Sequence, residues 1–100
     1  MECVTFLCDD MRIGIYSLSH CKDCIEYHKT VEAFCETTGV PFQIIDLDLQ
    51  QHVKCIVQYR LTFIPSTLFF AEDDRVLVNK GGLLTLDQLY QSYYDAIFNC

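Results

Sequence analysis

Two cysteines, Cys21 and Cys24, follow an apolar run at 13–16 and are the residues of this chain best suited to chemistry. The pattern from Cys21 to about Thr38 predicts an amphipathic helix, because apolar side chains recur there at spacings of three and four. A thiol at the start of a helix faces unpaired backbone N–H groups and the positive end of the helix dipole. Both stabilise a thiolate, so Cys21 is predicted to be a nucleophile near neutral pH.

The neighbouring side chains should tune the pKa of Cys21. Lys22 favours the thiolate and Asp23 opposes it, so the two effects nearly cancel. His20 helps only when it is protonated. Cys24 lies one turn deeper in the helix, where burial raises a thiol pKa and keeps the group protonated. Cys21 is therefore expected to attack a disulfide, and Cys24 to resolve the mixed disulfide that results.

A zinc site is the alternative use of four cysteines, Cys3, Cys8, Cys21 and Cys24. Cys3 and Cys8 lie an odd number of residues apart in a predicted strand, so their side chains should point to opposite faces. No Gly or Pro forms a metal-binding turn between them. We therefore expect no metal.

Composition excludes other classes of function. The formal net charge is −7 and the seven Lys and Arg residues are scattered, so we expect no nucleic-acid binding. The N-terminus lacks a signal-peptide pattern and no apolar run could span a bilayer, which predicts a cytoplasmic protein without a membrane partner. In that reducing compartment Cys35 and Cys55 are expected to be buried free thiols.

The remaining elements should position the cysteine pair. Strands are expected at 12–17, 42–47, 66–71 and 75–79, helices at 21–38, 48–59 and 85–98, and a possible extra strand at 3–8. The order βαβαββα predicts an α/β fold with a central mixed four-stranded sheet, whose first two strands are parallel and whose last two are antiparallel. Asp48 is expected to cap the helix at 48–59.

From Arg12 onward the chain resembles the thioredoxin and glutaredoxin superfamily. The features that carry the resemblance are the Cys-x-x-Cys at a helix start, Ile64-Pro65 before the third strand, and a Gly-containing loop before the last helix. The segment 59–70 is especially similar to the thioredoxin stretch around its cis-proline. The resemblance implies a single thioredoxin-like domain over 1–100. It also implies that Pro65 is cis, packs beside the cysteines and presents the backbone of Ile64 to an extended substrate.

The sequence also departs from thioredoxins. His20 replaces their tryptophan, Lys-Asp replaces Gly-Pro between the cysteines, and Ile15 occupies the place of their buried acid. The proton acceptor expected for Cys24 is therefore missing. His28, one turn beyond Cys24, is a candidate substitute; the alternative is a partly exposed histidine without a catalytic part.

The resemblance implies a thiol-disulfide oxidoreductase that reduces protein disulfides, in electron transport and cell redox homeostasis, with no cofactor other than its own redox disulfide. Gly81 and Gly82 resemble the paired glycines of glutaredoxins, which would make glutathione a co-substrate, but they could also form a tight turn. A reductase is therefore favoured over glutathione as electron donor. A thioredoxin-fold binding adaptor with little redox activity is the other alternative. We expect a monomer.

Overall fold

The computed structural model describes residues 11–100 and contains the predicted order of strands and helices, with one additional 3-10 turn. In chain order the elements are β1 (Arg12–Ser17), α1 (Lys22–Thr38), β2 (Phe42–Asp46), η2 (Gln50–His52), α2 (Lys54–Gln58), β3 (Ser66–Phe70), β4 (Val76–Gly81) and α3 (Leu86–Asn99). The possible extra strand at 3–8 lies outside the described residues.

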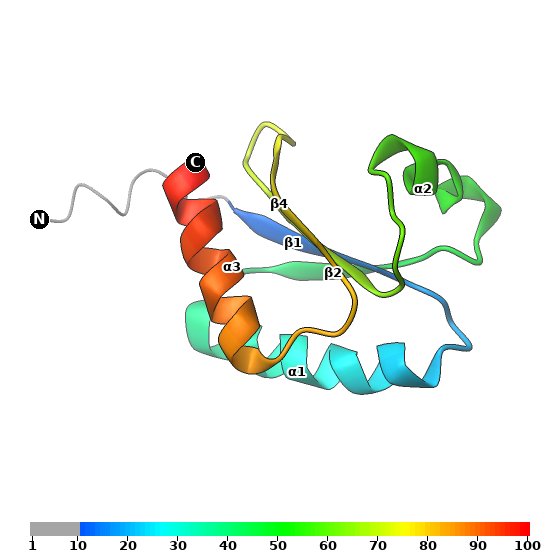
Figure 1. Cartoon of the computed structure of the whole chain (residues 1–100), viewed down its shortest axis with the longest axis horizontal. Coiled ribbons are helices and arrows are strands. Elements are labelled where there is room, and N and C mark those ends of the chain that lie inside the picture. The colour runs from blue at the N-terminus through cyan, green and yellow to red at the C-terminus, as the bar shows by residue number, and fades with distance from the viewer. Residues whose placement is uncertain (1–10) are drawn as a thin grey trace, which may run out of the picture.

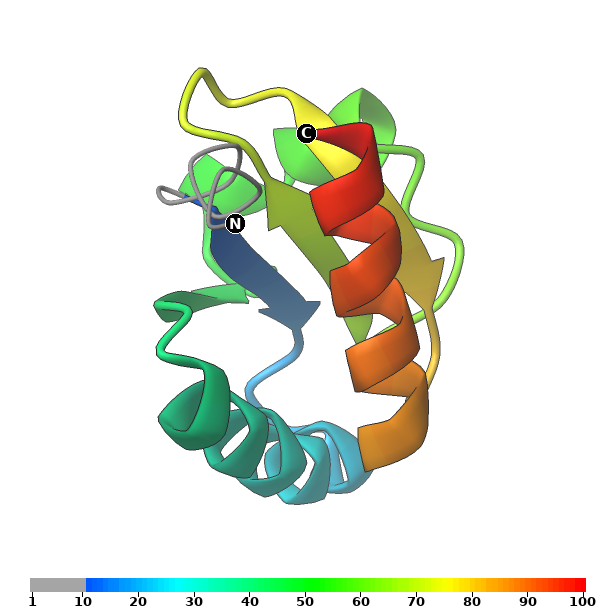
Figure 2. The same ribbon diagram turned by 90° about the vertical axis from the view of Figure 1, so that its left-hand side faces the viewer.

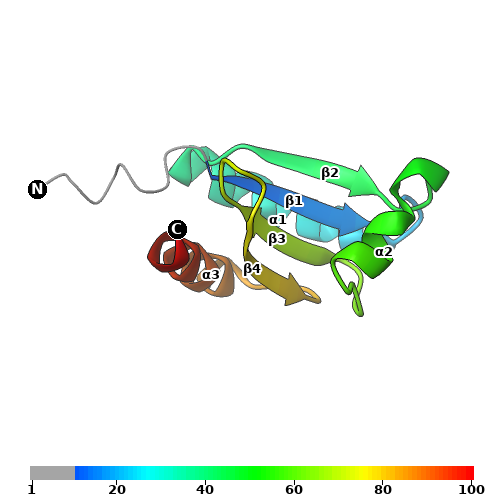
Figure 3. The same ribbon diagram turned by 90° about the horizontal axis from the view of Figure 1, so that it is seen from above.

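The four strands form the predicted mixed sheet, in the order β2-β1-β3-β4 (Figure 3). β1 is parallel to β2, as the long helical connection between them requires, and antiparallel to β3, which in turn is antiparallel to β4. Ser66 at the start of β3 pairs with Tyr16 near the end of β1. Pro65 and the loop that leads from β1 to Cys21 therefore lie at the same edge of the sheet.

Helices α1 and α3 pack against one face of the sheet, where the larger part of the core lies (Figures 1 and 2). Phe34 of α1 is fully buried there. Its ring lies edge-on to Phe69 of β3, at 6.4 Å between centroids, and to Tyr90 of α3, at 5.0 Å. The three elements are thereby joined around one aromatic centre, which fixes α1 against the sheet.

Caps fix the ends of both long helices. Gly39 adopts φ 78°, a left-handed conformation that favours glycine, and its N–H donates to the carbonyl of Cys35 at 2.8 Å. Thr85 and Gln88 form the capping box of α3, with Gln88 N–H donating to Thr85 Oγ1 at 3.2 Å and Thr85 N–H to Gln88 Oε1 at 2.8 Å. The helix boundaries thus follow from local side-chain chemistry.

The prediction of one helix over 48–59 was only partly confirmed, because the helical residues there are fewer and are divided between two elements. The segment forms η2 and the short α2, neither of which has a fully buried side chain, and Val57 is 81% exposed. Asp48 caps neither element, because Leu49 is the residue before η2 and its side chain makes no capping hydrogen bond. Cys55 is only partly buried, whereas Cys35 is buried as expected.

Candidate redox site

Cys21 is the N-cap residue of α1, and its sulfur is bound to the sulfur of Cys24 in a disulfide. The two Cα atoms are 5.2 Å apart. Cys21 has extended backbone angles, φ −85° and ψ 109°, which turn its side chain back over the first turn of the helix. Cys21 Sγ accepts a hydrogen bond from the Cys24 N–H at 3.1 Å. The sulfur thus occupies the position in which a helix N-terminus stabilises negative charge.

The two cysteines differ in their access to solvent. Cys24 is 0% exposed, whereas Cys21 is partly exposed. Solvent can therefore reach Cys21, whereas Cys24 is covered. Lys22 and Asp23, between the two cysteines, are exposed in the first turn of α1. Within residues 11–100, no group of three or more His, Cys, Asp or Glu side chains could hold a metal ion, and Cys3 and Cys8 lie outside that range.

The peptide bond between Ile64 and Pro65 is cis, which confirms the prediction made from the resemblance. Pro65 is fully buried at the edge of the sheet from which the Cys21 loop departs. Two hydrogen bonds hold the loop that contains this proline: Gly82 N–H donates to the carbonyl of Pro65 at 2.8 Å, and the hydroxyl of Ser66 donates to the carbonyl of Phe63. The backbone before β3 is therefore fixed from two sides.

The paired glycines contact this same loop. Gly82 has φ 89°, a conformation that other residues rarely adopt. A Cβ atom on Gly81 would come within 3.0 Å of both Cβ and Cδ2 of Phe63. Phe63 itself is 65% exposed, and sequence analysis did not single it out. Its part in the site depends on the tertiary contact with Gly81, which no local pattern predicts.

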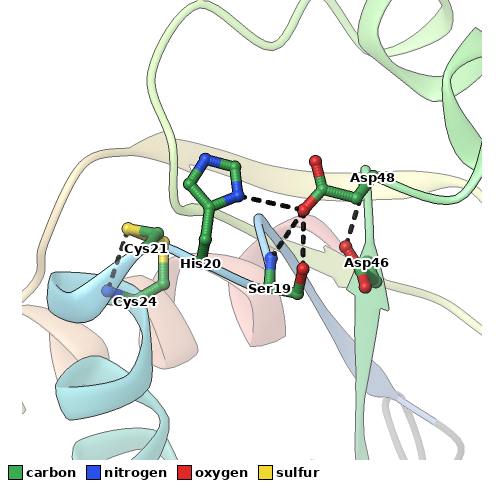
Figure 4. A network of polar contacts seen from close by, with 6 residues as sticks. All are labelled: Ser19, His20, Cys21, Cys24, Asp46 and Asp48. Carbon is green, nitrogen blue, oxygen red and sulfur yellow. Dashed lines mark hydrogen bonds and ion pairs between the residues drawn. A yellow bond between two sulfur atoms is a disulfide. The ribbon is translucent and has the colours of Figure 1, made fainter.

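Asp48 connects the segment after β2 to the loop before Cys21 (Figure 4). Its Oδ2 accepts hydrogen bonds from Ser19 N–H at 3.1 Å and from the Ser19 hydroxyl at 2.6 Å, and lies 3.2 Å from His20 Nδ1. Asp48 N–H in turn donates to Asp46 Oδ1 at 2.9 Å. The Ser19 hydroxyl is the main cause of a lowered pKa at Asp48. Sequence reasoning missed this role because the partners are almost thirty residues apart.

His28 faces β1, where its Nε2 lies 3.2 Å from the hydroxyl of Ser17. Burial lowers the pKa of His28, because desolvation disfavours the charged ring. Ile15 is fully buried, as expected for a residue that replaces an acid. In the part of the chain that the structure describes, the buried polar side chains are all uncharged: Ser17, Ser66, Thr67 and Ser92. No buried carboxylate therefore stands behind Cys24 within residues 11–100.

The chain matches no family model and no curated protein sequence. Solved structures are nevertheless similar to it. A mutant thioredoxin from Halobacterium salinarum NRC-1 is 24% identical, with a TM-score of 0.70 over 82% of this chain and 70% of that one. A thioredoxin from Fasciola hepatica is 18% identical, with a TM-score of 0.72 over 91% and 85%. An uncharacterized thioredoxin-like protein from Clostridium perfringens is 13% identical, with a TM-score of 0.73 over 87% and 71%.

These likenesses establish the class of structure. The chain has a thioredoxin-like fold, with a mixed four-stranded sheet and a Cys-x-x-Cys pair at disulfide distance at the start of α1. Cys21, Cys24 and Pro65, which the sequence placed in one site, are found at one edge of that sheet.

Proposed function

We propose that this protein is a thiol-disulfide oxidoreductase that reduces protein disulfides by dithiol exchange. The observation that carries the proposal is the N-cap position of Cys21, whose sulfur accepts the Cys24 N–H at 3.1 Å. A free thiol with a pKa of about 8.5 is only roughly 3% thiolate at pH 7, whereas at a helix N-terminus the pKa falls to about 3.5–7.5. Once reduced, the site therefore holds a reactive thiolate.

The reaction proceeds in two exchanges. The Cys21 thiolate attacks one sulfur of the substrate disulfide, a mixed disulfide forms, and the other substrate sulfur leaves with the electron pair. Cys24 then attacks Cys21 Sγ, which releases the reduced substrate and leaves the disulfide seen in the structure. Ile64 before the cis-proline offers its backbone to the extended substrate, and Gly81 and Gly82 support that loop.

His28 is the proposed acceptor of the Cys24 proton. His28 is four positions after Cys24 in α1, so their side chains lie on one face of the helix. The lowered pKa keeps the ring neutral at pH 7, and a neutral imidazole can accept a proton. The Ser17 hydroxyl holds one ring nitrogen, at 3.2 Å from Nε2. His28 would thus replace the acid that Ile15 cannot supply.

The electron donor is proposed to be a reductase, with glutathione as the alternative co-substrate. Glutathione use would need open backbone at Gly81, but Phe63 lies against that glycine, within 3.0 Å of where a Cβ would stand. This contact supports the reductase. Parallel assays of turnover with a thioredoxin reductase and with glutathione decide between them, and faster turnover with glutathione would reverse the assignment.

Cysteine substitutions test the function itself. Cys21→Ser should abolish insulin disulfide reduction, and Cys24→Ser should accumulate a covalent mixed disulfide that is visible by mass spectrometry. Cys55→Ser is the matched control, because Cys55 is a partly exposed free thiol outside the pair. Equal activity of the Cys21 variant and the unchanged protein would favour the adaptor. A reduction potential well above the cytosolic poise would contradict the assignment as a reductant.

No helix in residues 11–100 is long and apolar enough to cross a membrane. The cytoplasmic location, the monomeric state, and the absence of bound cofactor and nucleic-acid partner remain predictions of the same proposal. Sedimentation of the purified protein checks the monomer.

A further inference from the structure

We propose that His20, held by Asp48, is the general acid that protonates the sulfur leaving the substrate disulfide when Cys21 attacks. The inference rests on the proposed function and adds a second reacting group to it. His20 is then a catalytic residue and Asp48 a positioning residue, although Asp48 belongs to the segment between β2 and η2, well away from Cys21 in the sequence.

The contacts of Asp48 fix which nitrogen of His20 can react. An ionised carboxylate only accepts hydrogen bonds, so Nδ1, at 3.2 Å from Asp48 Oδ2, carries a proton. The other ring nitrogen, Nε2, faces away from Asp48 (Figure 4). A carboxylate paired with one ring nitrogen fixes the tautomer and the orientation of the ring. Asp46 Oδ1, which accepts the Asp48 N–H at 2.9 Å, anchors the carboxylate in turn.

The location of His20 suits a group that meets substrate. It directly precedes Cys21, and 75% of its side chain is exposed, compared with 37% for Asp48. Ser19, in the same loop, donates hydrogen bonds to Asp48 from its N–H and its hydroxyl. These bonds fix the backbone that carries the His20 imidazole. Lys22 and Asp23, which follow Cys21, are exposed in the first turn of α1.

The chemistry requires a proton at this point. As the bond between Cys21 Sγ and the attacked sulfur forms, the substrate S–S bond breaks and the second sulfur leaves as a thiolate. A protein thiolate, with a conjugate pKa of about 8.5, is a poor leaving group near neutral pH. Protonated His20 donates from Nε2 to that sulfur, becomes neutral, and regains a proton from water. A leaving thiolate whose conjugate thiol has a low pKa needs no such proton donor. Alkylation of Cys21 needs none either.

Three probes therefore separate acid catalysis from mere positioning of the thiolate. In a Cys24→Ser background, which isolates the Cys21 attack, the rates of reaction are measured near pH 7 with bis(2-hydroxyethyl) disulfide, with the aromatic disulfide 5,5′-dithiobis(2-nitrobenzoate), and with iodoacetamide. The variants are His20→Asn and Asp48→Asn, since an amide at position 48 can still accept the Ser19 hydrogen bonds. Asp73→Asn is the matched control, because Asp73 is another exposed aspartate with a cationic partner, Arg75.

We expect both test variants to react about tenfold or more slowly with the alkyl disulfide, since general acids typically contribute at least 10²-fold. Their rates with the aromatic disulfide and with iodoacetamide should stay within about twofold of the parent, and the double variant should lose no more than either single one. An equal loss with all three probes, or no loss with any, would overturn the role of His20 and leave the proposed function standing. If the parent is alkylated at Cys21 but reacts with neither disulfide, the proposed function fails as well.

Discussion

Gly81 at the end of β4 lies against Phe63, so that a Cβ atom on the glycine would stand 3.0 Å from Cβ of the aromatic residue. Phe63 Cβ is fixed to the backbone, and rotation of the ring cannot move it away. The glycine is therefore a packing requirement of the loop that precedes Pro65. Any side chain at position 81 must displace that loop.

Gly81→Ala should accordingly lower both stability and activity. We expect a loss of about 1–3 kcal/mol in the free energy of unfolding, as for other overpacked sites, together with a higher KM for a protein disulfide. Urea denaturation and insulin reduction measure the two effects. Combining it with Phe63→Ala should recover stability, and failure of the pair to compensate would show that the contact does not limit position 81.

His28→Ala should slow the release of reduced substrate from the mixed disulfide. Burial lowers the pKa of His28, so the neutral ring is present at pH 7, and the rate should fall as acid protonates it below the ordinary value of 6.5. We expect about a tenfold or greater loss at pH 7 and the disappearance of this pH dependence. Stopped-flow kinetics of the resolving step provide the measurement. His52→Ala is the control, because its ring lies 3.1 Å from the Asp46 carbonyl and belongs to η2, not to α1. An unchanged rate in His28→Ala would remove His28 from the mechanism.

The hydroxyls of Tyr27 and Thr67 form a buried hydrogen bond of 2.6 Å between α1 and β3. Thr67→Val would leave the Tyr27 hydroxyl buried without this partner, at a cost of about 1–3 kcal/mol in the free energy of unfolding. Adding Tyr27→Phe removes the unsatisfied group and should restore most of the loss. Denaturation of both variants measures the difference. A double variant with a lower free energy of unfolding than Thr67→Val would contradict the explanation.

Asp48 should contribute stability that depends on pH. The Ser19 hydroxyl holds the pKa of Asp48 below its ordinary value of 3.8 in the folded protein. The contribution is therefore present above pH 3.8 and is lost as the pH falls through the folded-state pKa. Asp48→Asn should be less stable than the unchanged protein at about pH 7, and the gap should narrow as the pH falls below 3.8. A gap that does not change with pH would mean that the carboxylate charge is not involved.

Local signals predicted most of the fold. Gly39 and Thr85 marked helix boundaries that the structure confirms, because caps act within a few residues. Asp48 shows where such reasoning ends: its side chain could cap a following helix, yet it binds Ser19 and His20 across the edge of the sheet. A tertiary contact of this kind produces no periodic pattern of residues in the sequence.

The residues of the site also divide into those that the sequence predicts and those that depend on tertiary contacts. The residue pattern at the helix start identified the cysteine pair, and the resemblance identified the cis bond at Pro65, which has no strong local signal of its own. Phe63 and Ser17 were missed because their significance arises from partners on other strands and helices, Gly81 and His28. Side chains that act through such partners become visible only when the sheet assembles them.

The hydrogen bond from Cys24 N–H to Cys21 Sγ makes one backbone amide a reporter of the oxidation state of the protein. In the disulfide the accepting sulfur is neutral, whereas the proposed function makes it a thiolate in the reduced site, and a charged acceptor strengthens a hydrogen bond. The Cys24 amide proton should therefore move downfield on reduction and exchange more slowly with solvent. The resonance of this amide would show whether the cysteine pair is oxidised or reduced, without any substrate.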